Sequence, residues 1–131
     1  MSEGAVPAEL GYTKSHEWVR TEGDVLTVGI TDHAQSELTD IVYVDLNVKS
    51  KTVTAGGVVL VLESVKTVAD VYAPAAGEVV EVNAALKAHP EYVNRSPYGD
   101  GWLFRLKLTG PAAPGSLLTA DEYRAFLASG G

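Results

Sequence analysis

The sequence predicts an all-β protein, a sandwich or barrel of short strands with few helices. Three observations support this class. Short runs rich in β-branched residues recur along the chain, turn-forming residues separate them at regular spacing, and helical patterns are confined to brief segments. A parallel sheet would instead alternate its strands with long helices. With 131 residues, the chain is long enough to form one domain with a hydrophobic core.

Six segments carry the strand pattern. The first, 25–30, alternates between the two faces of a strand, and the others are 41–46, 58–62, 68–72, 79–82 and 102–108. Residues that favour turns, mainly Gly, Pro, Asp and Ser, lie between them at 22–24, 55–57, 74–77 and 96–101. We expect these turns to separate consecutive strands.

Two short helices are expected inside this pattern. Asp32, followed three residues later by Gln35, resembles a capping box and predicts a helix from 32 to about 38. Asn83 can cap one or two turns over 84–88, which Pro90 would end.

The last helix is the best marked. Thr119 and Glu122 form a T-x-x-E capping box, and Leu118 can pack on Tyr123 across the first turn. One face is then apolar, formed by Tyr123, Phe126 and Leu127. The Gly-Pro-Ala-Ala-Pro-Gly segment 110–115 is expected to be a loose tether to this helix.

Composition excludes several classes of protein. The net charge of −7 argues against nucleic-acid binding, which needs a basic face, and the absence of cysteine excludes thiol catalysis, disulfides and thiolate metal sites. No apolar run approaches the roughly 20 residues that span a bilayer, and the N-terminus lacks the pattern of a signal peptide. We therefore expect a cytoplasmic protein with no membrane association.

An internal repeat points to one lysine. Residues 55–61 and 76–82 agree at five of seven positions at an offset of 21, which suggests two quasi-equivalent halves. Their midpoint falls between Lys66 and Thr67, in a short link between the strand candidates 58–62 and 68–72. Two strands joined so closely form a hairpin, so Lys66 is expected at its exposed tip.

The residues around this tip resemble the lipoylation loop of glycine cleavage system H proteins. The similarity rests on Glu63-Ser64-Val65-Lys66-Thr67, on Asp70 and on Tyr72-Ala73-Pro74. Further blocks that are similar to the family lie in the same order at 12–20, 28–35, 77–83, 93–94, 97–99 and 101–102. They cover roughly residues 10–108, and 118–127 is also similar.

This resemblance implies an architecture. It is a barrel-sandwich hybrid of two antiparallel sheets, with a few short flanking helices and a C-terminal helix. The chain would form a single domain over 1–131, with the lipoyl hairpin at about 58–72 and the C-terminal tether and helix at about 109–128.

The resemblance also implies a function in glycine catabolism. Lipoate would be attached by an amide to Lys66, and the chain would be a non-catalytic carrier. Glycine decarboxylase (the P protein) would load the arm with an aminomethyl group, and aminomethyltransferase (the T protein) would pass the one-carbon unit to tetrahydrofolate. Dihydrolipoamide dehydrogenase (the L protein) would then reoxidise the arm. A lipoate ligase or a lipoyl/octanoyl transferase would attach it.

The family pattern assigns roles to five further residues. Glu63 and Gly77 match features that lipoylating enzymes recognise, although Glu63 could be a solvated loop charge and Gly77 a turn residue that needs a positive φ. Ser15, Glu17 and Asp70 match positions that hold the aminomethyl arm, for which a hydroxyl and carboxylates are suited. Alternatively, Ser15 is only a turn residue and the two carboxylates are solvated strand-end charges.

Three departures from the family affect turn geometry. The loop 46–50 lacks the Pro, acidic residue and Gly that relatives usually carry, Thr39 stands where Gly is common, and Ser96 where Asp is frequent.

Other functions fit less well. A biotin carboxyl carrier usually has Met on both sides of the lysine, where this chain has Val65 and Thr67, and a lipoyl domain of a 2-oxoacid dehydrogenase is usually followed by further domains. No G-x-S-x-G, P-loop or H-E-x-x-H motif indicates an enzyme, and no metal site is expected. A lipoyl donor to other complexes and a diverged interaction module that is not lipoylated remain as alternatives.

Overall fold

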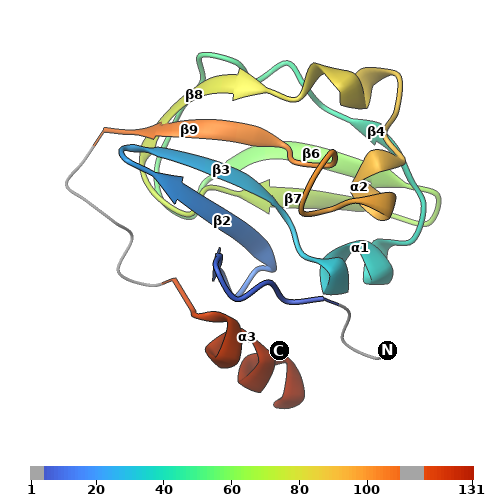
Figure 1. Ribbon diagram of the computed structural model, residues 1–131. Helices are drawn as coiled ribbons and strands as arrows, with labels where there is room; N and C mark the ends of the chain where they lie inside the picture. Colours follow the sequence, from blue (N-terminus) through green and yellow to red (C-terminus); the bar gives the residue numbers. More distant parts are fainter. Residues whose placement is uncertain (1–4, 110–116) are drawn as a thin grey trace.

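The computed structural model describes residues 5–109 and 117–131 of the chain (Figure 1). In this part of the chain, strands form one six-stranded and one three-stranded antiparallel sheet, with short helices at their ends and a C-terminal helix below β2. The predicted all-β class with two antiparallel sheets is therefore confirmed. The predicted tether at 110–115 lies outside the described residues.

The larger sheet has the strand order β1-β2-β3-β9-β8-β5. Its strands are β1 Gly11–Tyr12, β2 Glu17–Glu22, β3 Val25–Ile30, β9 Phe104–Leu108, β8 Gly77–Val82 and β5 Thr52–Val53. The smaller sheet has the order β4-β6-β7, with β4 Ile41–Val44, β6 Val58–Ser64 and β7 Val68–Tyr72. The helices are α1 Asp32–Leu38, the 3₁₀ helix η1 Ala84–Lys87, α2 Tyr92–Arg95 and α3 Ala120–Ala128.

All six predicted segments contain a strand, but β2 was not predicted from its pattern. Trp18 and Val19 are consecutive and both buried, which breaks the alternation expected of a strand with one face in water. The reason is that β2 is covered on both sides. Val19 belongs to the main core, whereas Trp18 belongs to a second cluster.

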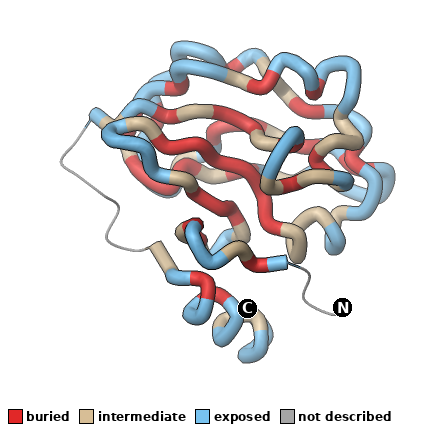
Figure 2. The backbone as a smooth tube through the Cα atoms, viewed as in Figure 1, coloured by how far each residue is buried: buried red, intermediate tan, exposed pale blue. Residues whose placement is uncertain are grey.

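The main core fills the space between the two sheets, where the buried segments of Figure 2 run side by side. The second cluster contains Val6, Leu10, Tyr12, Trp18, Ala120 and Tyr123. It attaches α3 to the outer side of β1 and β2, and the rings of Tyr12 and Tyr123 stack with centroids 4.8 Å apart.

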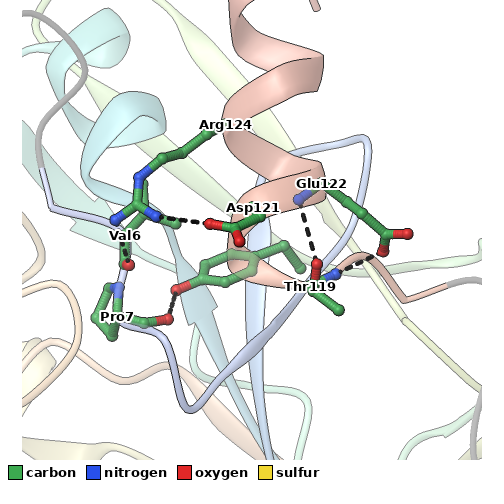
Figure 3. Close-up of polar contacts among 7 residues, drawn as sticks. Val6, Pro7, Thr119, Asp121, Glu122 and Arg124 are labelled. Carbon is green, nitrogen blue, oxygen red and sulfur yellow. Dashed lines mark hydrogen bonds and ion pairs between the residues drawn. The ribbon is translucent and has the colours of Figure 1, made fainter.

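Hydrogen bonds fix both ends of this attachment (Figure 3). The predicted capping box is confirmed, since Thr119 accepts from the Glu122 backbone N–H and the Glu122 carboxylate accepts from that of Thr119. Arg124 donates to the Val6 carbonyl at 3.1 Å, which ties the N-terminal segment to α3. Leu118 packs on the same cluster, as does the apolar face of α3.

The two internal helices begin at capping side chains. Asn83 caps η1 as predicted, accepting from the Ala85 N–H at 3.3 Å. The cap of α1 is Thr31 rather than Asp32, because the Thr31 hydroxyl accepts from the Ala34 N–H. Asp32 is the first helical residue and accepts a hydrogen bond from Gln35 instead, so the predicted cap was wrong by one position.

Backbone strain occurs at two of the departures from the family. Thr39, which ends α1, has φ 61° and ψ −152°, a region that only Gly occupies readily. Ser50, in the loop that lacks the usual Gly, has φ 73°. Both turns keep a geometry that favours Gly although the chain does not supply it.

The two copies of the repeat lie in different sheets, at the starts of β6 and β8. Gly56 and Gly57 exchange backbone hydrogen bonds with Ala73 at 2.8 Å, and in the second copy Glu78, which corresponds to Gly57, pairs with Thr52 of β5. Because Ala73 follows Thr52 by the same 21 residues that separate the copies, the pairing is reciprocal. This supports the predicted quasi-equivalence of the two halves.

Candidate functional site

Lys66 lies exposed at the tip of the β6–β7 hairpin, as predicted. The tip is held by short-range contacts: Ser64 N–H donates to the Thr67 carbonyl at 2.8 Å, and the Ser64 hydroxyl accepts from the Thr67 N–H at 3.1 Å. The Val65 N–H also donates to the Asp40 carbonyl, just before β4. The backbone on either side of Lys66 is therefore fixed while its side chain extends into water.

The two residues predicted to guide lipoylation lie in different places. Glu63 is exposed on β6, directly beside Val68 of β7 and three residues from Lys66. Gly77 is buried at the start of β8 in the other sheet. Its φ is not positive, so the interpretation as a turn residue was wrong. A Cβ there would lie 2.3 Å from the Lys107 carbonyl oxygen, so close packing against β9 requires the glycine.

The three residues predicted to hold the arm line one groove. Ser15, Glu17 and Asp70 come together in a cavity of about 340 Å³ beside the hairpin. Ser15 lies just before β2 and Glu17 is its first residue, whereas Asp70 comes from β7. Apolar side chains of both sheets and α1, among them Ile30, Leu38, Leu62 and Val71, complete the lining.

Glu17 is not a solvated strand-end charge, because its side chain is only 1% exposed. Oε1 accepts hydrogen bonds from the hydroxyls of Ser15, at 2.6 Å, and Thr13, and Oε2 accepts from the Tyr72 N–H at 3.1 Å. Burial raises the pKa of Glu17 above its ordinary value, and these three donors act against that shift. The last of them links β2 of the larger sheet to β7 of the hairpin.

Two histidines line the same groove, which sequence reasoning did not bring together. His16 and His33 are 17 positions apart, yet the β2–β3 pairing places their rings 4.8 Å apart. His16 is hydrogen-bonded through Nδ1 to the Tyr123 hydroxyl at 2.7 Å, and that hydroxyl also bonds Thr31. Burial and the neighbouring His33 lower the pKa of His16, so the neutral ring is favoured. Recognising β2 as a strand would have been the signal for this pair.

Other kinds of site find little support in the described residues. Between 5 and 109 and from 117 onward, no group of three or more His, Asp or Glu side chains is placed to hold a metal ion. The helices over the same residues include none long and apolar enough to cross a membrane.

An exposed lysine at a hairpin tip on a two-sheet β-sandwich is the architecture of carrier domains that bear a group on that lysine. The family model for the glycine cleavage H-protein matches residues 10–130. The chain therefore belongs to this family, which provides the lipoyl carrier subunit of the glycine cleavage system.

Individual relatives agree with this assignment over nearly the whole chain. The glycine cleavage system H protein of Laribacter hongkongensis is 56% identical over 119 residues, covering 90% of this chain and 94% of the relative. Those of Alcanivorax borkumensis and Thermus thermophilus are each 52% identical and cover 95% of this chain and 96% and 97% of the relatives. The crystal structure of the Mycobacterium marinum H protein superposes with a TM-score of 0.84 at 41% identity, covering 94% and 99% of the two chains. The diverged interaction module is accordingly not favoured.

Proposed function

We propose that this chain carries lipoate on Lys66 and serves as the carrier between the enzymes of glycine cleavage. The observation that supports this most is the position of Lys66, exposed on a fixed hairpin tip whose strands also form one wall of the groove. The β6–β7 hairpin thus provides both the tip and one wall of the groove. An arm on Lys66 can therefore reach partners outside the molecule and can also fold back into the groove.

The residues present fit a lipoyl group. An exposed ammonium on a flexible stem is accessible to an acylating enzyme, and the adjoining groove combines apolar walls with polar groups at its rim. When attached, lipoate supplies a disulfide that accepts the aminomethyl group of glycine and must later be reoxidised. The chain contributes the amine that holds it and the groove that shelters it from water.

Within the groove, Ser15 and Asp70 are suited to hold a protonated amine. Ser15 commits its proton to Glu17, so its oxygen lone pairs are available as acceptors. Asp70 is an exposed carboxylate on the facing strand. We assign Glu17 to the orientation of Ser15, since its carboxylate is buried and already accepts three hydrogen bonds from within the protein.

For lipoylation, we propose that Glu63 contacts the modifying enzyme directly, because it is exposed beside Lys66. Gly77 is buried and paired to Leu108, so we propose that it acts through the packing of β8 on β9.

The proposed partners are the P, T and L proteins and a lipoate ligase or lipoyl/octanoyl transferase. Membership of the family implies the first three in general terms. The net charge of −7 suits docking onto basic partner surfaces. The cytoplasmic location is a prediction that cell fractionation would check.

The first test is intact mass after incubation with lipoate, ATP and a lipoate ligase. Wild type should gain one lipoyl group, Lys66→Arg should gain none, and the matched control Lys107→Arg, at an exposed position on β9, should behave as wild type. A lipoyl group on Lys66→Arg, or none on folded wild type, would contradict the proposal.

A second measurement addresses the groove. With the arm charged by glycine decarboxylase, Asp70→Ala should lose the aminomethyl group to water, as formaldehyde and ammonia, faster than wild type, whereas Glu78→Ala, which removes an exposed carboxylate on β8, should not. Equal release from the two variants would remove Asp70 from this role.

A further inference from the structure

A β-bulge lies directly beside the lysine-bearing hairpin. Ile41 pairs with Ser64 and Tyr43 pairs with Glu63, so Val42 is an extra residue in β4. As a result, two consecutive apolar side chains face water opposite Glu63, with exposed fractions of 52% for Val42 and 49% for Tyr43. Bulges of this kind redirect side chains and are frequent next to functional sites.

The bulge is part of a larger exposed surface. Tyr43, Glu63 and Val68 form one row across β4, β6 and β7, so the carboxylate has an apolar neighbour on each side. Val65 and Val68, which flank the tip, are 72% and 62% exposed. We call this surface the bulge face; it consists of Val42, Tyr43, Glu63, Val65 and Val68.

Its composition is unusual for this molecule. Of the six large hydrophobic residues that are exposed in the described part of the chain, four belong to the bulge face, and the other two are Val58 and Val80. Scattered exposed apolar residues need no explanation, but a contiguous group around a charged residue indicates a contact surface.

The bulge face is fixed relative to Lys66. The hydrogen bond of 3.0 Å from Val65 N–H to the Asp40 carbonyl joins the hairpin tip to the start of β4. Beside Val42 and Tyr43 lies a hollow of about 280 Å³, lined further by Leu46, Leu86 and Lys87. A partner that places a side chain in this hollow would therefore meet Lys66 in a defined orientation.

We propose that the bulge face is the docking surface for the enzyme that acylates Lys66. This rests on the proposed function and extends it from Glu63 to Val42, Tyr43, Val65 and Val68. The enzyme would present a cationic side chain to Glu63, within an apolar rim that covers Tyr43 and Val68.

The reach of the lysine identifies this partner among the others. An unmodified lysine extends only about 6 Å from its Cα, so the acylating enzyme must contact the surface immediately around the tip. Enzymes that use the finished arm, which adds on the order of a dozen ångströms, can dock farther away.

The test compares the lipoylation rates of variants with similar substitutions, some on the bulge face and some elsewhere. Tyr43→Ala combined with Val68→Thr should lower kcat/KM for a lipoate ligase by roughly tenfold or more, mainly through KM. Glu63→Gln should also lower it and weaken its salt dependence. Val58→Thr, on the same hairpin at its other end, and Val80→Thr, on β8, should stay within about twofold of wild type.

Each outcome has a distinct meaning. Urea unfolding shows whether the bulge-face variants are folded. If they are folded but are lipoylated as fast as Val58→Thr, this inference is overturned and the carrier function stands. If wild type itself is not lipoylated, the proposed function fails instead. A concentration-dependent dimer that Tyr43→Ala abolishes would assign the face to a second copy of the chain and also overturn the inference.

Discussion

Two glutamates beside the hairpin have opposite environments. Glu17, in the groove, is 1% exposed and accepts hydrogen bonds from Thr13, Ser15 and the Tyr72 N–H. Glu63, on the bulge face, is exposed between Tyr43 and Val68. Glu17 therefore has a structural role, because it joins β2 to the hairpin, while Glu63 is available to a partner. The same side chain serves internal positioning in one place and recognition in the other.

The largest expected difference is in stability. Glu17→Ala removes the acceptor of the Tyr72 N–H and of two hydroxyls, and should lower the free energy of unfolding by about 2–3 kcal/mol. Glu63→Ala should change it by less than about 0.5 kcal/mol, because the side chain is exposed. Urea unfolding of both variants measures this. Equal losses would end the distinction between the two carboxylates.

Two tyrosines extend the comparison. Tyr123 is fully buried, and its hydroxyl bonds both His16 and Thr31 behind the groove. Burial raises its pKa to about 12, so it stays protonated at neutral pH. Tyr123→Phe should cost about 1–2 kcal/mol because the buried Thr31 and the half-buried His16 each lose a hydrogen bond. Tyr43→Phe, on the bulge face, should leave the free energy of unfolding nearly unchanged. Thermal or urea unfolding measures both variants, and a loss in Tyr43→Phe as large as that in Tyr123→Phe would contradict this prediction.

The bulge-face side also contains removable strain. Thr39 precedes β4 with a φ of 61°, so Thr39→Gly should raise the free energy of unfolding by about 1 kcal/mol. Thr21→Gly, at an exposed position in β2, should lower it, because Gly in a strand loses more conformational freedom. Thermal unfolding separates the two, and a loss of stability in Thr39→Gly would show that the turn is not strained.

The smallest effect concerns pH. Because the pKa of Glu17 is raised on folding, the folded state binds its proton more readily than the unfolded chain does. The contribution of Glu17 to stability is thus complete below pH 4.5, its ordinary pKa, and declines as pH rises through the folded value. The unfolding free energy of wild type should fall relative to that of Glu17→Gln over this range. A constant difference between the two proteins would argue against a raised pKa.

Much of the fold could be predicted because its signals are local. The capping box of α3, the hairpin and the six strand segments each depend on residues a few positions apart, and the repeat located Lys66 without any structure. The failure to predict β2 has a cause outside the segment. β2 has buried residues on both faces because α3 covers one of them, and nothing in the segment itself shows that a distant helix lies there.

The sequence alone determined the all-β class, the hairpin with Lys66 at its tip and the membership of a lipoyl-carrier family, because periodicity, turn residues and motifs are properties of neighbouring positions. Only the tertiary structure decided that Glu17 is buried and Glu63 exposed, that His16 meets His33, and that Gly77 is required by the Lys107 carbonyl. These facts depend on which surfaces two sheets and a terminal helix bring together. Burial and close approach between distant segments arise only when the whole chain has packed.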